Sequence, residues 1–433
     1  MLENREARAA RQREALFVGT GCIVSFSLNI PGPVKTGALI EKAFSEGEAA
    51  LMAAFGASLV PFSRQTEATG CEGLYLVSAA PEEAKQKTVA IEESHPLGRL
   101  FDMDVVTENG ALSRPLPRRC LLCGREAKIC ARSRAHGVPA LQEGVAVLLE
   151  GYFAEKAAEK MADRAAAAMR FEVSLTPKPG LVDLNDSGAH TDMDAQTFFQ
   201  STEALYPWLK KLYLTGRAHG EEGDEALFAR LRTLGRGAEE AMLRATGGVN
   251  THKGLLFSLA LLLGAAGRLQ AGTDRALSAA EQTAEAAKLA RYALRDFSDA
   301  QLGQSYRLYG VTGARGEAAN GFPTVLSYGL PVWNETLAQG GSASFAASKT
   351  LLSLMAHTED ANIVRRAGKA EAERRRAQAK EILSILTGEN RKPVLTGLNA
   401  EYIEKNISPG GAADLLVLTM VLGKAVTTDN SDL

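Results

Sequence analysis

The chain has 433 residues, of which 45% are hydrophobic and 23% are charged, a composition typical of globular proteins and not of disordered or fibrous ones. Its 49 basic and 51 acidic residues give a formal net charge of −2, which argues against a nucleic-acid partner held by a global positive field. A chain of this length exceeds what one hydrophobic core usually organises, so we expect two or three domains.

No segment has the features of a membrane span or a secretion signal. The most apolar stretch, residues 254–267, is shorter than the ~18–20 apolar residues that a bilayer requires, so we expect a buried helix there. The first 17 residues are charged and lack the apolar region of a signal peptide. Five cysteines do not suggest a disulfide scaffold. We therefore expect a cytoplasmic protein without a membrane partner.

Strand and helix patterns are mixed in the first part of the chain. Residues 15–30 are rich in β-branched and aromatic residues and predict a strand that ends at the Pro-Gly-Pro turn of residues 31–33. A helix is expected next, followed by three strands and a hairpin turn at Asn109-Gly110. The helix is predicted at residues 37–55 and the strands at residues 74–77, 89–91 and 100–107. We predict an α/β or α+β domain over residues 1–143.

The second part of the chain reads as helical throughout. Its segments are rich in Ala, Leu, Glu and Arg with an apolar period near 3.6, and short loops rich in Gly, Pro, Asn and Asp separate them. The predicted helices cover residues 148–172, 195–214, 224–244, 275–295, 342–357 and 365–387. Strand patterns almost vanish. We predict an all-α bundle domain over residues 144–433.

Asp102 and Asp104 are the first candidate functional residues. Because side chains alternate along a strand, the sequence Asp102-Met103-Asp104 places both carboxylates on one face of the predicted strand. Two such carboxylates can hold a hard cation through oxygen, an arrangement that suits phosphoryl or nucleotidyl transfer. Alternating acids on an edge strand can also simply face water, and the Asp-x-Asp pattern alone favours this plainer interpretation.

A second candidate is a cysteine-rich segment. Four residues in the spacing C-x2-C-x6-C-x5-H offer the ligands of a closed structural zinc site, namely Cys120, Cys123, Cys130 and His136. The last two spacings depart from common zinc patterns, so reduced cysteines without metal are an equal alternative. Arginines and lysines lie between these residues. They predict binding of diphosphate or of an acidic partner, with a solvated basic face as the alternative.

Three segments of the first part, in order, resemble the family of holo-carrier-protein synthases of citrate lyase. They are residues 25–36 (SFSLNIPGPVKT), 100–105 (LFDMDV) and 113–136 (SRPLPRRCLLCGREAKICARSRAH). Members of that family attach a phosphoribosyl-dephospho-coenzyme A group to a serine of the citrate lyase acyl carrier subunit and release diphosphate. The resemblance implies magnesium ligands, phosphate ligands and a loop that cradles the substrate. The implied residues are Asp102 and Asp104 for magnesium, Arg114 and Arg119 for phosphates, and Asn29 and Lys35 for the loop.

Four polar segments interrupt the predicted helices, at residues 172–194, 247–254, 310–323 and 357–368. Charged and amide residues gathered in loops between apolar helices predict one site assembled in a bundle, and cations beside carboxylates suit a metal-bound triphosphate. Helix caps and connecting loops explain the Gly, Asn and Asp residues well, but they explain His252-Lys253 and Arg315-Gly316-Glu317 less well. No G-x-x-x-x-G-K-[ST] motif is present, which excludes P-loop nucleotide chemistry.

These four segments, together with residues 406–418 (NISPGGAADLLVL), resemble the triphosphoribosyl-dephospho-coenzyme A synthase family. The resemblance runs from about residue 165 to the end of the sequence. It implies that ATP is a sugar donor: a ribose hydroxyl of dephospho-coenzyme A attacks the anomeric carbon of the ATP ribose, and adenine departs.

The implied reaction assigns roles to residues of the polar segments. Breaking the N-glycosidic bond benefits from an acid near the purine and a base near the attacking hydroxyl. The candidates are His190, Asp192, Asp194 and His252, and His252 is favoured because histidine titrates nearest to physiological pH. Substrate binding is expected from Lys178, Asn250, Lys253, Arg315, Glu317, Asn362 and Arg366. Magnesium is expected on Asp360, with Asp194 or Glu317 as alternative ligands.

The product of the second half would be the substrate of the first, so the sequence predicts a bifunctional enzyme that matures citrate lyase. The expected partners are ATP, 3′-dephospho-coenzyme A and the acyl carrier subunit, with Mg²⁺ and a structural Zn²⁺ as metals. The equivalent pathway of malonate decarboxylase is the nearest alternative. A non-catalytic zinc adaptor that docks an acyl carrier protein is the other. Release of adenine from ATP distinguishes the enzyme from the adaptor.

Overall fold

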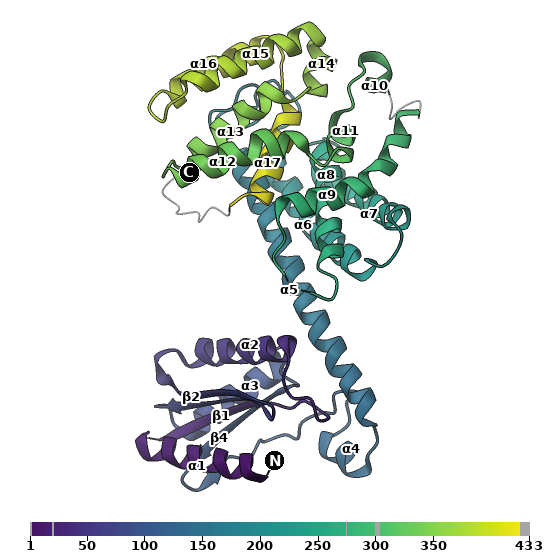
Figure 1. The fold of residues 1–433 in the computed structure, drawn as a ribbon. Coiled ribbons are helices and arrows are strands. Elements are labelled where there is room, and N and C mark those ends of the chain that lie inside the picture. Colours follow the sequence, from purple (N-terminus) through teal and green to yellow (C-terminus); the bar gives the residue numbers. More distant parts are fainter. Residues whose placement is uncertain (1, 20, 274, 299–303, 425–433) are drawn as a thin grey trace. The chain divides into compact units, whose positions relative to one another are not determined.

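The computed structural model describes residues 2–19, 21–273, 275–298 and 304–424 (Figure 1). Its contacts divide the chain into two compact units, Met1–Ala154 and Glu155–Leu433, which are described separately below. Over the described ranges, none of the helices has both the length and the hydropathy needed to cross a bilayer.

The N-terminal unit contains a five-stranded antiparallel sheet with the strand order β2-β3-β1-β4-β5. Its elements in chain order are α1 (Leu2–Val18), β1 (Cys22–Leu28), α2 (Ala38–Phe55), η1 (Gly56–Ser58), β2 (Leu59–Glu67), β3 (Gly70–Val77), α3 (Pro81–Ser94), β4 (Phe101–Thr107), β5 (Gly110–Ala111) and α4 (Ala127–Ser133). The first part of α5 (Val138–Ser174) also belongs to this unit.

Helices cover both faces of this sheet. Figure 1 shows α1 on one side of the strands and α2 with α3 on the other. The α2 side holds the main core, where the ring of Phe26 stacks on that of Phe44 with their centroids 4.6 Å apart. The α1 side is smaller and buries Ala15 against Ile23. The predicted mixed fold of this part is therefore an α+β arrangement.

Two predicted strands of the N-terminal unit need correction. Residues 15–18 belong to α1, so the strand predicted over residues 15–30 occupies only Cys22–Leu28. Residues 89–91, predicted as a strand, lie inside α3, which begins at Pro81. Val89 and Ile91 are buried together with Ala84, and this spacing follows a helical face rather than an alternating strand. The strands at residues 74–77 and 100–107 are confirmed.

All regular elements among the described residues of the C-terminal unit are helices, as predicted. Its elements are the rest of α5, α6 (Ala195–Ala218), α7 (Asp224–Ala245), α8 (Lys253–Leu269), α9 (Ala279–Ala290), η2 (Arg291–Ser298), α10 (Gln304–Tyr309), α11 (Gly313–Ala319), η3 (Val325–Gly329), α12 (Leu330–Ala338), α13 (Ala343–His357), α14 (Ala361–Ala367), α15 (Lys369–Ile385), α16 (Arg391–Glu404) and α17 (Gly410–Leu422). The helix predicted over residues 365–387 is two helices, because Gly368 between them has a positive φ of 84°.

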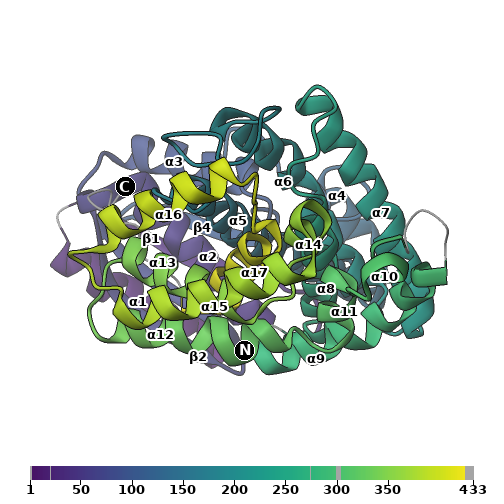
Figure 2. The same ribbon diagram turned by 90° about the horizontal axis from the view of Figure 1, so that it is seen from above.

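The core of this unit is built around α8, the buried helix expected at residues 254–267. Glycine lets α6 approach it closely: a Cβ on Gly216 would lie 1.9 Å from the carbonyl oxygen of Gly264. Helix α17 also packs on α8, whereas α15 and α16 lie at one end of the unit, uppermost in Figure 1 and toward the viewer in Figure 2. The N-termini of α8 and α17 thereby lie close to the loop of residues 172–194 and to α14.

The predicted domain boundary near residue 143 falls inside a continuous helix. Helix α5 begins at Val138 and ends at Ser174. Val145, Leu149 and Phe153, in its first half, are buried in the core of the N-terminal unit. The boundary itself stays a prediction, and the contacts favour a later position for it, after Ala154.

Candidate active sites

Asp102 and Asp104 lie on the same face of β4, the face that α1 partly covers. In register, they pair with Ser27 and Ser25 of β1, and Ser25 accepts a hydrogen bond from Gln12 of α1. Asp102 Oδ1 lies 3.0 Å from Arg118 Nη2. The surrounding protein atoms and the negative charge of Asp102 raise the pKa of Asp104. The strand and its shared face are confirmed, whereas the role of the pair in binding magnesium stays a prediction.

Five arginines surround a pocket of about 640 Å³ in the N-terminal unit. Two of them are the predicted phosphate ligands Arg114 and Arg119. The remaining three are Arg99, Arg118 and Arg125. Such a concentration of guanidinium groups is suited to bidentate contacts with phosphate oxygens. We call it the arginine pocket.

Glu92, which the sequence did not single out, connects the arginine pocket to the sheet. Its side chain is 2% exposed, and its Oε1 accepts a hydrogen bond of 2.7 Å from the backbone N–H of Met103. The same carboxylate contacts Arg118 and lies 3.5 Å from Arg114 Nε. Burial raises the pKa of Glu92, and Arg118 opposes this shift. Because Arg118 contacts both Glu92 and Asp102, the pocket and the aspartate pair are linked.

The two predicted residues of the substrate loop do not contribute to the lining of the arginine pocket. Asn29 and Lys35 are in the connection between β1 and α2, and neither is among the described residues that line the arginine pocket. The backbone N–H of Asn29 donates to the carbonyl of Leu100 at 2.7 Å. Lys35 Nζ donates to the carbonyl oxygen of Ile30. The backbone of Asn29 is thus bonded to the residue that precedes β4, whereas Lys35 is bonded within its own loop.

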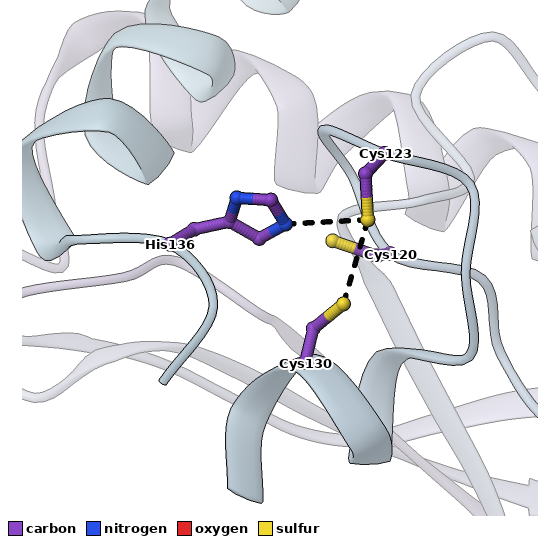
Figure 3. A group of neighbouring side chains, drawn as sticks. All are labelled: Cys120, Cys123, Cys130 and His136. Carbon is purple, nitrogen blue, oxygen red and sulfur yellow. Dashed lines mark hydrogen bonds between the residues drawn. The ribbon is translucent and has the colours of Figure 1, made fainter. Parts of the chain in front are cut away.

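The four residues of the cysteine-rich segment converge, as Figure 3 shows. The ligand atoms of Cys120, Cys123, Cys130 and His136 all lie within 4.8 Å of one another. Cys123 Sγ is 3.4 Å from Cys130 Sγ and 3.2 Å from His136 Nε2. Arg125 and His136 lower the pKa of Cys123 to about 5, so this thiol is a thiolate at neutral pH. Burial raises the pKa of Cys130 to about 11. The cluster has the donor set and the spacing of a metal site.

Three of the four predicted polar segments meet in one pocket of about 450 Å³ in the C-terminal unit. Residues 406–418 complete it. We call it the polar pocket, and its charged and amide lining residues are Glu172, Lys178, His190, Asp192, Asn250, His252, Lys253, Asn362, Arg365, Arg366 and Asp414. The predicted assembly of one site from loops distant in sequence is thus reproduced for these segments.

His252 occupies the N-cap position of α8 and is almost completely buried. Its Nδ1 lies 2.7 Å from Ser201 Oγ, which accepts a hydrogen bond from Thr251. Burial and the nearby charge of Lys178 lower the pKa of His252 to about 3. The imidazole is therefore neutral at physiological pH. His252 was favoured for proton transfer because histidine ordinarily titrates near neutral pH. That reason does not hold for this buried side chain.

His190 lines the same pocket and contacts two other segments of the chain. Its Nε2 is 2.9 Å from Ser408 Oγ, and its Nδ1 is 3.5 Å from Arg366 Nη2. Asp192 Oδ1 lies 3.9 Å from the same Nδ1. Burial and the charge of Arg366 lower the pKa of His190, and Asp192 opposes them. Arg366 also donates to Asn406 and is thereby held at the pocket.

Lys178 is buried at the pocket and paired with Glu172. Its side chain is 1% exposed, and Nζ donates to both the carbonyl oxygen and Oε1 of Glu172, each at 2.6 Å. Asp183, from the same polar segment, accepts hydrogen bonds from the backbone N–H groups of Lys178 and Asn185. The first polar segment is therefore organised by its own charged side chains before any ligand is considered.

A second pocket of about 290 Å³ shares Gly254, Asn362 and Asp414 with the polar pocket. It contains two of the predicted magnesium ligands, Asp360 and Glu317. Asp360 accepts backbone hydrogen bonds from Asn362 and from Ala412, so it caps α14 and holds the start of α17. Glu317 accepts hydrogen bonds from the backbone and the hydroxyl of Thr324. Both carboxylates serve the local structure.

Asp414 is the functional candidate that the sequence analysis missed. It lies in the first turns of α17, at the junction of the two pockets. A Cβ on Gly254 would lie 2.5 Å from Asp414 Oδ2, so the carboxylate approaches the backbone of α8 closely. Within the described part of the chain, it makes no hydrogen bond or ion pair. Burial and the charges of Asp360 and Glu172 raise the pKa of Asp414 well above its usual value. In the sequence, only its position as a single acid within the apolar run GGAADLLVL could have indicated this residue.

Two predicted residues lie outside both pockets. Asp194 is the N-cap of α6, where it accepts hydrogen bonds from the backbone and hydroxyl of Thr197. This capping box is its evident role. Arg315 lines a third pocket with Lys253 and pairs with Asp296, whose Oδ2 is 3.2 Å from Arg315 Nε. Lys253 itself borders both that pocket and the polar pocket.

Comparison with known proteins agrees with the two resemblances. Residues 1–152 match the family model described as apo-citrate lyase phosphoribosyl-dephospho-CoA transferase, and residues 158–431 match ATP:dephospho-CoA triphosphoribosyl transferase. Protein CitXG of Leuconostoc mesenteroides subsp. cremoris is 34% identical over 98% of this chain and 96% of its own length.

Two further relatives support the same pattern. Protein CitXG of Haemophilus influenzae is 32% identical over 97% of this chain and 94% of its own length. A probable 2-(5″-triphosphoribosyl)-3′-dephosphocoenzyme-A synthase of Photobacterium profundum is 40% identical and covers 59% of this chain and 84% of its own length. Similarity thus extends over the full chain for fused relatives and over part of it for a synthase.

Proposed function

Because this chain belongs to the family that fuses the ATP:dephospho-CoA triphosphoribosyl transferase with the apo-citrate lyase phosphoribosyl-dephospho-CoA transferase, we propose that each unit carries one reaction of citrate lyase maturation. The chain is a transferase that makes the prosthetic group of citrate lyase and attaches it. The C-terminal unit makes the triphosphoribosyl intermediate. The N-terminal unit transfers it to the acyl carrier protein. We place both reactions in the cytoplasm, which is consistent with the five free cysteines.

The observation that carries the first assignment is the convergence of three polar segments and α17 on the polar pocket. The attacking hydroxyl of dephospho-coenzyme A loses a proton as its oxygen bonds to the anomeric carbon of the ATP ribose. The bond from that carbon to adenine breaks, and adenine gains a proton. A pocket for this reaction needs a proton acceptor, a proton donor and cations for the triphosphate.

Asp414 is the proton donor in this proposal. A carboxyl group whose surroundings keep it protonated can protonate a departing base, as raised-pKa acids do in glycoside hydrolysis. His190 accepts the hydroxyl proton, and Asp192 stabilises the imidazolium that forms. Neutral His252 acts through hydrogen bonding rather than through titration. Lys253 and Arg366 hold the phosphates at the edge of the pocket.

In the N-terminal unit, the aspartate pair and the arginine pocket suit the release of diphosphate. Asp102 and Asp104 offer carboxylate oxygens on one face, the donor set that magnesium prefers. Magnesium bound there would neutralise the diphosphate and orient it. Arg114, Arg118 and Arg119 supply guanidinium groups in the arginine pocket, and Arg118 also contacts Asp102. In the C-terminal unit Asp360 and Glu317 already accept several hydrogen bonds, and we do not assign them to magnesium.

We propose that the cysteine cluster holds a structural zinc ion. Four donors with mutual distances up to 4.8 Å match a closed tetrahedral site, and Arg125 and His136 lower the pKa of Cys123, which favours the thiolate that zinc binds. Metal analysis of the purified protein should find about one zinc per chain, and Cys130→Ser should lose it. A metal-free protein with unchanged thermal stability would contradict this assignment.

One experiment tests the whole assignment. The full chain is incubated with ATP, magnesium and dephospho-coenzyme A, and free adenine is measured. Apo-acyl carrier protein is then added, and its mass increase and the released diphosphate are followed. We expect adenine first and diphosphate only after the carrier is added. Carrier modification without adenine release would contradict the role of the C-terminal unit, and the reverse result would contradict that of the N-terminal unit.

A further inference from the structure

A third pocket, of about 480 Å³, opens between α7 and α8 beside the polar pocket. Its walls are mainly apolar and include Phe228 and Leu231 of α7 and Phe257 and Leu261 of α8. It shares Lys253 and Gly254 with the polar pocket, so the two cavities adjoin at the first turn of α8. The proposed chemistry of the polar pocket makes no use of this α7–α8 pocket.

Cations outnumber carboxylates around the α7–α8 pocket. Four cationic side chains line it, namely Arg232, Arg236, Lys253 and Arg315, against the carboxylates of Glu239 and Asp296. Asp296 is shared, because it lies 2.9 Å from Arg232 Nη2 and 3.2 Å from Arg315 Nε. Arg236 is exposed and has no hydrogen-bond or ion-pair partner among the described residues. The pocket therefore carries a net positive charge of about two.

Aromatic rings hold two of these guanidinium groups beside the apolar walls. The guanidinium carbon of Arg232 lies 5.9 Å from the ring centroid of Phe228, and that of Arg315 lies 5.7 Å from Phe257. Cation–π contacts of this kind favour a fixed position of the charge. The result is an apolar cavity with positively charged groups at its edge. Its complement is a ligand with an apolar chain next to about two negative charges.

Only one of the two small substrates has this form. ATP consists of a base, a ribose and a triphosphate. Dephospho-coenzyme A has a diphosphate in place of the triphosphate, followed directly by a long, uncharged pantetheine arm whose methyl and methylene groups are apolar. Resting on the proposed placement of the reaction in the polar pocket, we infer that the α7–α8 pocket binds the pantetheine arm of dephospho-coenzyme A. Arg232, Arg236 and Arg315 bind its diphosphate. The ribose hydroxyl then reaches the polar pocket past Lys253.

This placement changes the expected role of one residue. From the sequence, Arg315 is expected to hold phosphates together with Lys178, Lys253 and Arg366. In the present proposal, Arg315 distinguishes dephospho-coenzyme A from ATP, because it faces the α7–α8 pocket alone. ATP phosphates are left to Arg366 and Lys253.

Gly235 offers a direct test. It lies inside α7 and lines the pocket, its φ is not positive, and a Cβ there would meet no atom within 4 Å. Gly235→Leu therefore fills the cavity without a clash at Cβ, and it replaces a poor helix former by a good one. Gly397→Leu is the matched control. Gly397 lies inside α16, has equally open space, and lines none of the pockets described above.

The readout is direct binding of dephospho-coenzyme A to the full chain by calorimetry, followed by steady-state adenine release. We expect Gly235→Leu to raise both the Kd and the KM for dephospho-coenzyme A at least about tenfold, since apolar contacts of the arm are lost. The KM for ATP should stay within about twofold. Gly397→Leu should equal the wild type in both measurements.

Adenosine diphosphate, which lacks the arm, separates the two parts of the proposal. As a competitive inhibitor against dephospho-coenzyme A, it should bind Gly235→Leu as it binds the wild type, but bind Arg236→Gln several-fold more weakly. A higher KM for ATP in either variant would assign the pocket to ATP. Unchanged binding of dephospho-coenzyme A in Gly235→Leu would overturn the inference. If the wild type binds dephospho-coenzyme A but releases no adenine, the proposed function fails while the binding test still decides the pocket.

Discussion

Replacing Lys178 by methionine should destabilise the C-terminal unit before any ligand binds. The substitution keeps an unbranched side chain that is one atom shorter, but it removes the cation that donates two hydrogen bonds of 2.6 Å to Glu172. The carboxylate is 7% exposed and would be left without its counter-ion. Breaking a buried pair from one side costs about 3–5 kcal/mol. For a large domain this corresponds to a fall in Tm of roughly 6–20 °C.

The assay is thermal and urea unfolding of the full chain without nucleotide, on a complete double-mutant cycle. Glu172→Gln removes the opposing charge, so the double variant Lys178→Met with Glu172→Gln should recover at least half of the lost stability. A second signal is independent of unfolding. Because the charge of Lys178 lowers the pKa of His252, that pKa should rise in Lys178→Met when measured by NMR.

A different outcome would refute the reasoning. If Lys178→Met changes the free energy of unfolding by less than about 1 kcal/mol and only raises the KM for ATP, Lys178 is a phosphate ligand and not part of a buried pair. Activity alone does not distinguish these cases, because both residues line the polar pocket.

Three further predictions concern other parts of the chain. Asp414→Asn should lower the rate of adenine release by ~10²–10⁴-fold. It should also raise Tm at neutral pH, because a carboxyl group with a raised pKa destabilises the fold where it would ionise, and this gain in Tm should vanish at acidic pH. A variant that is less stable than the wild type at neutral pH would contradict this prediction. The fragment of residues 1–154 should fold. The fragment of residues 1–143 lacks three buried side chains of α5, so its free energy of unfolding should be lower by about 5–9 kcal/mol. Equal urea midpoints of the two fragments would refute this. Asp102→Asn or Asp104→Asn should abolish carrier modification and leave adenine release intact, and wild-type modification at limiting magnesium would exclude a metal role.

The sequence predicted the helical part of the fold well because its helices are long and strongly periodic. It misassigned residues 89–91, where three apolar or β-branched neighbours resemble a strand if the helical face from Ala84 is not considered. It also extended the strand of residues 15–30 into α1. Short apolar runs do not contain enough turns to separate the two periods, and only the packing of α3 against β4 decides between them.

The sequence indicated candidate site residues by their chemical type. It could not indicate features that depend on how a side chain is buried in the folded protein. His190 and His252 were found because histidines in polar loops are conspicuous, but burial of His252 changes its protonation. Asp194 was chosen as a polar residue in the same loop, although the threonine three positions later indicates a helix cap. Asp414 was missed because its isolation among apolar residues becomes meaningful only when α17 is packed against α8.

The order of residues around the polar pocket has a consequence for how the enzyme is made. Glu172 and Lys178 leave the ribosome first, and Asp414 follows more than half of the chain later, in the last described helix. Until α17 emerges, Asp360 lacks its partner Ala412. Nascent chains can thus complete the arginine pocket while the polar pocket is still open. Premature termination or proteolytic trimming within α17 should yield molecules that still accept the finished intermediate but no longer produce it.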